Sequence, residues 1–259
     1  MASDLGASDI AQQARSSSSI RHIQFAQHHA LVDESDFPHF SLDLVNAAYL
    51  DAQNLLVGST VGRGTVWFLR NPDQQCQKQY VLRSYLRGGL VRHFLRDQYF
   101  HFNYRTSRAW QEFNLLQQLN REGFAVPRPV VAVVKRSGMI LRSFLMTERI
   151  SGAKDLFECL SQQAISNEIW QRIGRAIGAM HQRSVYHHDL NLRNILLDDS
   201  DQPWLIDFDK CAIRKPGSWE DDNLARLKRS FIKEKLSHPR LHWHPDNYEQ
   251  LLVGYLKSR

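Results

Sequence analysis

The sequence has few cysteines, no long apolar run and no internal repeat, and each absence excludes a class of protein. Its three cysteines, Cys76, Cys159 and Cys211, are odd in number and form no C-x-x-C motif. Neither a disulfide framework nor a zinc cluster is therefore predicted, which suits a reducing cytoplasm. No run of about 18 apolar residues is present, so no membrane-spanning helix is expected. The first residues also lack the apolar core of a signal peptide.

Composition and charge describe a globular chain with a modest basic excess. Of 259 residues, 42% are hydrophobic and 23% are charged, which fits one large domain or two lobes. The net charge of +6 suits an anionic partner such as a nucleotide, an acidic sugar, a lipid headgroup or nucleic acid, although it also serves solubility. Residues 1–30 are predicted to be a disordered or loosely ordered tail, because the segment begins with small polar residues and a run of serines.

The most informative stretch runs from residue 186 to residue 210. His188-Asp189 is followed by Asn194, and a second polar group, Asp207-Phe208-Asp209, comes later. Residues 195–197 and 204–206 between them read as two short buried strands joined by an acidic turn. Such a hairpin places Asp189, Asn194 and Asp207 in one cleft. The amide and the second carboxylate are suitable Mg²⁺ ligands, which leaves Asp189 to accept a proton; the alternative is an aspartate that only caps a turn.

The spacing H-x-D-x-x-x-x-N followed by D-F-x resembles the catalytic and metal-binding loops of protein-kinase-like phosphotransferases. The resemblance implies an α+β, two-lobed protein-kinase-like fold. Residues 31–150 would form an N-lobe with an antiparallel sheet and one long helix. Residues 151–259 would form a mainly helical C-lobe.

In the N-lobe, the pattern predicts nucleotide contacts. Gly62 and Gly64 lie between two expected strands, as in a hairpin lid over phosphates, although a plain glycine turn is equally consistent. Arg83 stands where kinases carry the strand lysine; an exposed strand arginine is the alternative. A planar guanidinium and a compact ammonium contact phosphate differently, so this departure bears on nucleotide geometry.

Two glutamates complete the expected nucleotide-binding set. Glu112 falls in a helix predicted over residues 107–121, where it would pair with the strand cation, unless it is simply solvated. Glu148 lies in a predicted hinge, where backbone groups hold adenine. Further helices are expected over residues 167–183, 221–236 and 246–257, and a short one is hinted at between residues 42 and 50.

Three features separate this sequence from peptide kinases. Asn191 replaces the usual lysine two residues after Asp189, and Arg193, four residues after it, is a candidate for the same γ-phosphate charge. The metal loop reads DFD rather than DFG. No A-P-E segment follows, and only 49 residues lie beyond Lys210, which leaves little room for a peptide-binding platform.

Several stretches together resemble the 3-deoxy-D-manno-octulosonic acid (Kdo) kinase family, within the lipopolysaccharide-core kinases. They are Gly62-Arg-Gly64, Val81-Leu-Arg83, Arg87-Gly-Gly-Leu90, Glu112-Phe113, Leu115-Leu116, Val126-Pro-Arg-Pro129, Leu145 to Ile150, His188-Asp-Leu-Asn191 with Asn194, Leu205 to Lys210, Asn223-Leu224 and Arg226 to Ser230. The resemblance implies ATP- and Mg²⁺-dependent phosphorylation of the Kdo 4-hydroxyl on a Kdo-lipid A precursor.

The same resemblance implies a location and a set of partners. It places the enzyme peripherally at the cytoplasmic face of the inner membrane, with neither nucleic acid nor an obligate protein partner. Arg87, Arg92 and Arg96 are candidate cations for the acceptor's anionic groups or for an anionic membrane surface, unless their helix packs inward. Kinases for heptose or for a small molecule, and a non-catalytic kinase-like binding module, are the alternatives.

Overall fold

A computed structural model describes residues 19–61, 65–73, 77–87, 103–137 and 140–258. The chain divides into two compact units. One comprises residues up to 122 together with 128–149, and the other comprises residues 123–127 and 150–259. The division after Arg149 lies one residue before the boundary predicted between the lobes, and the second unit gains the short segment 123–127.

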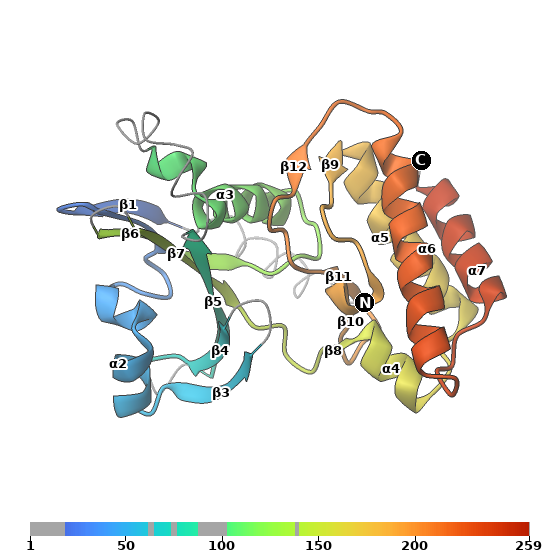
Figure 1. Ribbon diagram of the computed structural model, residues 1–259, viewed down its shortest axis with the longest axis horizontal. Helices are drawn as coiled ribbons and strands as arrows, with labels where there is room; N and C mark the ends of the chain where they lie inside the picture. Colours follow the sequence, from blue (N-terminus) through green and yellow to red (C-terminus); the bar gives the residue numbers. More distant parts are fainter. Residues whose placement is uncertain (1–18, 62–64, 74–76, 88–102, 138–139, 259) are drawn as a thin grey trace, which may run out of the picture. The chain divides into compact units, whose positions relative to one another are not determined.

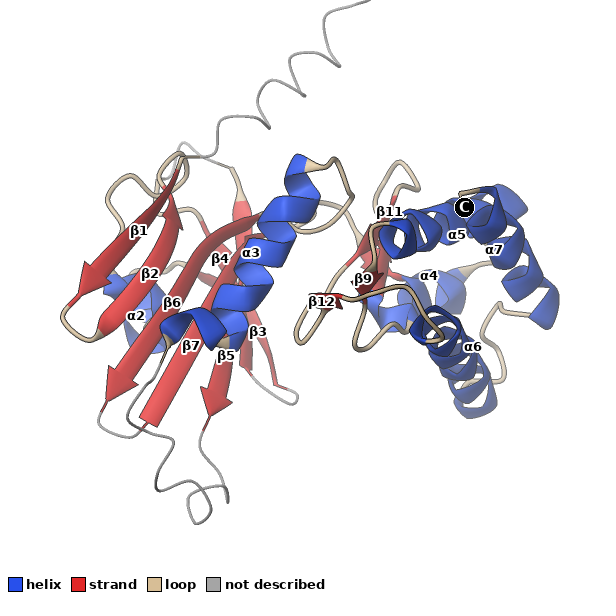
Figure 2. Ribbon diagram, turned by 90° about the horizontal axis from the view of Figure 1, so that it is seen from above, coloured by secondary structure: helices blue, strands red, loops and turns tan. Residues whose placement is uncertain are grey.

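The first unit is built on a seven-stranded antiparallel sheet with the strand order β1-β2-β6-β7-β5-β4-β3 (Figures 1 and 2). The helix α3 packs on β6 and β7. The elements of this unit are β1 (Ile20–Phe25), β2 (His28–Asp33), the 3-10 helix η1 (Leu42–Val45), α2 (Ala47–Ala52), β3 (Leu56–Val61), β4 (Thr65–Arg70), β5 (Gln79–Arg87), the 3-10 helix η3 (Tyr104–Thr106), α3 (Arg108–Arg121), β6 (Pro129–Ser137) and β7 (Ile140–Glu148).

Strand β6 shows why the sheet sits in the middle of this unit. Its residues 130–134 are Val-Val-Ala-Val-Val, and each is at most 1% exposed. A strand buried on both faces reads as a continuous apolar run rather than as an alternation of apolar and polar residues. Apolar side chains of η1 and α2, such as Leu44 and Leu50, join the same core cluster as Val131 and Val133.

The predicted N-terminal tail requires a correction. Residues 20–30, which were assigned to it, form β1 and the start of β2, paired from Ile20 opposite Asp33 to Phe25 opposite His28. The prediction was wrong here because β1 is polar and half-exposed, so it carries no clear period-two apolar pattern. Residues 1–18 lie outside the described part of the chain.

The second unit is mainly helical and carries two small sheets (Figure 1). Its elements are β8 (Lys154–Asp155), α4 (Leu156–Gln162), α5 (Asn167–Gln182), β9 (Val185–Tyr186), the 3-10 helix η4 (Leu192–Asn194), β10 (Ile195–Leu197), β11 (Pro203–Leu205), β12 (Ala212–Ile213), α6 (Trp219–Ser237) and α7 (Pro245–Lys257). The hairpin predicted after Asn194 is confirmed, with Ile195 opposite Leu205. The predicted α+β fold class, with an antiparallel sheet and one long helix before a mainly helical part, is confirmed.

Helix α5 packs closely against α7 because glycines let the two backbones approach. A Cβ atom added to Gly174 would lie 1.9 Å from the carbonyl oxygen of Leu251, and one added to Gly254 would lie 2.0 Å from that of Gln171. The apolar stripe predicted for α5 is buried, including Trp170, Ile173 and Ile177. This packing supports β9, which leads directly into the loop that carries Asp189.

Candidate active site

The loop from residue 187 to residue 194 presents Asp189 from a rigid base. Leu190 and Leu192 are at most 1% exposed and anchor the loop, whereas the side chain of Asp189 is 54% exposed. The backbone carbonyl of Asp189 accepts hydrogen bonds from two side-chain amide nitrogens, Nδ2 of Asn191 at 2.9 Å and Nδ2 of Asn194 at 2.8 Å. Two side-chain amides therefore fix the backbone that carries the exposed carboxylate.

Asn194 is oriented by both its backbone and its side chain. Its carbonyl accepts a hydrogen bond from the N–H of Ile206 at 3.0 Å, which ties it to the residue before Asp207. Because Nδ2 donates to Asp189, Oδ1 points elsewhere, and it makes no hydrogen bond to any residue that the structure describes. An oriented amide oxygen suits a hard cation.

Asp207 has a backbone conformation that is uncommon outside glycine. Its φ is +65°, in the left-handed region, which aspartate adopts more readily than most residues with a side chain. Beside Asp207, Phe208 is 1% exposed and Ile206 is hydrogen-bonded to His187.

His187 links the two halves of the hairpin from the interior. Its Nε2 donates to the carbonyl of Ile206 at 3.1 Å, and its ring meets that of Phe208 edge-on, with centroids 5.1 Å apart. Burial lowers the pKa of His187, and the opposing effects of the Ile206 carbonyl and the Asp207 and Asp189 charges do not overcome it. The imidazole is thus neutral near pH 7 and acts as a support between the loop and Asp207.

The structure places Arg193 away from Asp189. Its guanidinium contacts Glu234 at 3.3 Å and lies 3.9 Å from the ring centroid of Phe157. The cation beside Asp189 is instead Arg226 of α6, with its Nη1 3.5 Å from Asp189 Oδ1. Arg226 lies 37 residues beyond Asp189 in the sequence, and no local pattern connects it with the loop.

In the first unit, the predicted pairing of Arg83 with Glu112 is confirmed. Arg83 on β5 donates to Oε1 of Glu112 on α3, and the hydroxyl of Tyr85 donates to Oε2 at 2.6 Å. The side chain of Glu112 is 1% exposed and that of Arg83 is 20% exposed. The pair fixes one end of the guanidinium, while a fifth of the Arg83 side chain stays exposed.

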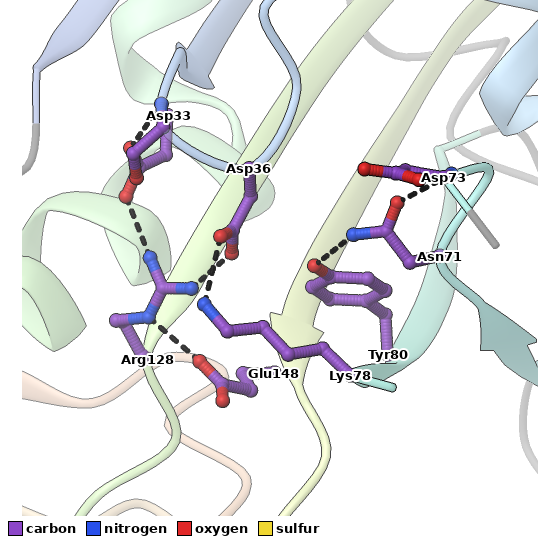
Figure 3. A network of polar contacts seen from close by, with 9 residues as sticks. Asp33, Asp36, Asn71, Asp73, Lys78, Tyr80, Arg128 and Glu148 are labelled. Atoms are coloured by element: carbon purple, nitrogen blue, oxygen red, sulfur yellow. Dashed lines mark hydrogen bonds and ion pairs between the residues drawn. The ribbon is translucent and has the colours of Figure 1, made fainter. Parts of the chain in front are cut away.

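Glu148, at the end of β7, belongs to an ionic network around Arg128 that the sequence did not predict (Figure 3). Arg128 donates to Glu148 at 2.8 Å, to Asp33 at 2.6 Å and to Asp36, which also pairs with Lys78. Burial alone would lower the pKa of Arg128, but the charges of Asp36 and Glu148 outweigh it and raise the pKa. This network holds the end of β7 against the segment that follows β2.

Several predicted positions lie outside the described residues. Gly62 and Gly64 are among them, although the strands on either side, β3 and β4, pair up to Val61 opposite Thr65, as a hairpin requires. Arg92 and Arg96 also lie outside, and Arg87 is described only as a backbone position at the end of β5. Within the described residues, no group of three or more His, Cys, Asp or Glu side chains is arranged to hold a metal ion.

Comparison with known proteins identifies the family. The model of the lipopolysaccharide kinase (Kdo/WaaP) family matches residues 47–255. A 3-deoxy-D-manno-octulosonic acid kinase of Vibrio vulnificus is 40% identical over 232 residues, covering 90% of this chain and 96% of that protein. The protein of the same name from Vibrio cholerae is 42% identical over 189 residues, covering 73% and 79%.

More distant matches follow. The Haemophilus influenzae protein of the same name is 37% identical over 221 residues, covering 82% of this chain and 90% of that protein. Among solved structures, a co-crystal structure of WbdD with the kinase inhibitor LY294002 aligns with a TM-score of 0.47 and 14% identity, over 78% of this chain and 45% of that one. The family match and the curated relatives show that this chain belongs to the lipopolysaccharide kinase (Kdo/WaaP) family.

Proposed function

We propose that the protein transfers the γ-phosphoryl group of ATP to the 4-hydroxyl of Kdo on a Kdo-lipid A precursor. Membership of the Kdo/WaaP family and the names of its relatives support a sugar kinase of lipopolysaccharide core biosynthesis. The observation that carries the chemistry is the exposed carboxylate of Asp189 on a loop fixed by two side-chain amides, one of them from Asn194.

In this proposal Asp189 is the general base. A sugar hydroxyl is a weak nucleophile, and a carboxylate within hydrogen-bonding distance orients it and takes its proton as the bond to phosphorus forms. The exposure of Asp189 leaves room for the acceptor hydroxyl. The buried Leu190 and Leu192 anchor the loop and hold the carboxylate in position without covering it.

Asn194 and Asp207 would hold Mg²⁺, which when bound would neutralise negative charge on the transferring group. An amide oxygen and a carboxylate match the preference of this cation for oxygen ligands and for few protein groups. The Oδ1 of Asn194, which makes no hydrogen bond to any described residue, supports this assignment.

The nucleotide contacts are proposed for the first unit. Arg83, held by Glu112, would contact the α- and β-phosphates, and the glycine hairpin with Gly62 and Gly64 would cover them. The backbone near Glu148 would bind adenine. The side chain of Glu148 would not, because Arg128 holds it.

The acceptor class also sets the proposed location. An acylated, anionic lipid is met at a membrane surface, so we place the protein peripherally at the cytoplasmic face of the inner membrane, bound through cations that include Arg87, Arg92 and Arg96. Among the helices of the described residues, none is both long and apolar enough to cross a membrane.

The proposal is tested with γ-labelled ATP and a panel of acceptors. The panel contains Kdo-lipid A precursor, the same lipid without Kdo, a heptose-bearing core oligosaccharide and free Kdo, each with and without Mg²⁺. Label should enter only acceptors that carry Kdo, and only with Mg²⁺. Label in heptose instead would identify a different core-sugar kinase. No labelled acceptor and no consumption of ATP would favour a non-catalytic binding module.

A further inference from the structure

One face of helix α6 follows the loop that carries Asp189. Four of its residues, spaced three, four and four apart, lie on the same side of the helix. Each contacts a different residue of the loop. The pairs, in order along α6, are Asn223 with His187, Arg226 with Asp189, Ser230 with Leu192 and Glu234 with Arg193.

The pairs on either side of Arg226 fix its position. Asn223 is 1% exposed; it accepts from the N–H of His187 at 3.1 Å and donates to the carbonyl of the same residue at 3.0 Å. The hydroxyl of Ser230 accepts from the N–H of Leu192 at 3.2 Å. Because both contacts are to loop backbone, the register of α6 along the loop is set by the fold, and Arg226 is placed beside Asp189 as a consequence.

The contact between Arg226 and Asp189 is too loose and too exposed to serve mainly the fold. The atoms are 3.5 Å apart, and the side chains are 45% and 54% exposed. A charge-assisted hydrogen bond is shorter, at about 2.7–2.9 Å, and exposed ion pairs add little to stability. The register of α6 therefore holds a guanidinium next to the proposed base, where it is open to an anionic ligand.

We propose that Arg226 contacts the transferring phosphoryl group and stabilises the charge that its oxygens carry during transfer. The inference rests on the proposed function. The acceptor hydroxyl, hydrogen-bonded to Asp189, forms a bond from its oxygen to the γ-phosphorus and passes its proton to Asp189. The bond from that phosphorus to the bridging oxygen of ADP breaks at the same time. A guanidinium beside Asp189 is close to the position that the reacting phosphorus would occupy. Its planar group can donate to two oxygens of the phosphoryl group at once.

Arg226 would thus supply the charge that the sequence suggested for Arg193. Glu234 and the ring of Phe157 hold Arg193 elsewhere, while α6 brings a cation to Asp189 from 37 residues further along the chain. The same guanidinium chemistry would also suit an anionic group of the acceptor, such as a carboxylate, and steady-state kinetics separate these two sources of negative charge.

The test compares Arg226→Ala, Arg226→Lys, Arg193→Ala and a matched control, Arg229→Ala, which removes an exposed arginine from the same helix. Arg226→Ala should lower kcat by roughly 10²-fold, within the range seen when one charge-stabilising donor is removed. Its acceptor KM and melting temperature should stay near those of the parent. Arg226→Lys should recover part of kcat, and Arg229→Ala should match the parent. A raised acceptor KM with kcat retained would overturn the phosphoryl assignment in favour of an acceptor anion, as would a loss of kcat seen with Arg193→Ala and not with Arg226→Ala.

A binding measurement separates this inference from the proposed function. Calorimetry with Mg²⁺, ADP and aluminium fluoride, which mimics the transferring group, should show weaker binding for Arg226→Ala, while binding of Mg²⁺ and ADP alone should be unchanged. If the parent labels no acceptor yet the mimic still depends on Arg226, the proposed acceptor is wrong and the role of Arg226 stands. If acceptor labelling and mimic binding are both unaffected by Arg226→Ala, the inference is overturned and the proposed function stands.

Discussion

Two arginine–carboxylate pairs, one in each unit, illustrate two uses of the same chemistry. Arg83 donates to Glu112, which is almost completely buried, and the Tyr85 hydroxyl donates to the second carboxylate oxygen. Arg226 and Asp189 are 3.5 Å apart, and each is about half exposed. The first pair is enclosed by β5 and α3, whereas the second is presented to solvent by a fixed loop and a fixed helix.

The two pairs differ in how far their charges are shielded from water, and this decides what the loss of one partner does to stability. Removing one partner of a buried pair leaves an uncompensated charge in a poorly solvated place, which costs stability. Removing one partner of an exposed pair leaves a charge that water solvates, so stability hardly changes. Substitution of the buried Glu112 should therefore affect folding, whereas substitution of Asp189 or Arg226 should affect catalysis with little effect on folding.

The largest effect is expected at Asp189. Asp189→Asn keeps the shape of the side chain and removes its basicity, so turnover should fall by roughly 10²–10⁴-fold, with an unchanged melting temperature. Steady-state phosphoryl transfer and thermal unfolding check this, with Asp222→Asn, an exposed position on α6, as the control. Near-parental turnover in folded Asp189→Asn would exclude the carboxylate as the base.

The buried carboxylate should give the largest effect on stability. Glu112→Gln leaves the Arg83 guanidinium without its counter-ion, so the free energy of unfolding should fall by about 3 kcal/mol. Urea unfolding measures this, and Gln111→Ala, at the exposed neighbouring position on α3, should unfold like the parent apart from a small propensity effect. An unchanged unfolding midpoint for Glu112→Gln would show that the pair is not structurally important.

Arg83→Lys should separate the structural and nucleotide-binding uses of Arg83. The ammonium keeps the charge opposite Glu112 but loses the planar fork that would bind phosphate oxygens. We expect the KM for ATP to rise by roughly tenfold while most of the stability is retained. Unchanged ATP kinetics in both Arg83→Lys and Arg83→Ala would assign the nucleotide contact to another residue.

The smallest effect is expected at the edge of the Arg128 network. Lys78 is 42% exposed and pairs with Asp36 at 2.8 Å, while Arg128 also holds that carboxylate. Lys78→Ala should therefore change the free energy of unfolding by less than about 1 kcal/mol. Chemical denaturation checks this, and a loss comparable to that of Glu112→Gln would mean that exposure is a poor guide to the importance of these pairs.

The sequence predicted the features that depend on local patterns. Helix α5 and the helices near residues 221–236 and 246–257 are within two residues of their predicted bounds, because apolar residues recur along one face or capping residues mark the ends. The hairpin between Asn194 and Asp207, and the pairing of Arg83 with Glu112, followed from motif spacing. The roles of these side chains in catalysis remain predictions.

The features that were missed depend on contacts between distant parts of the chain. Arg128 and Asp33 are 95 residues apart, and no local spacing connects them. Arg226 reaches Asp189 only because Asn223 and Ser230 set the register of α6.

The most direct test is the position of the transferred phosphate. The protein is incubated with ATP, Mg²⁺ and Kdo-lipid A precursor, and the product is analysed by mass spectrometry and by linkage analysis of the released Kdo. The account predicts one added phosphate, on the 4-hydroxyl of Kdo, and none when Asp189→Asn replaces the parent protein. Phosphate on a different sugar or hydroxyl, or unmodified lipid in the presence of active, folded protein, would contradict it.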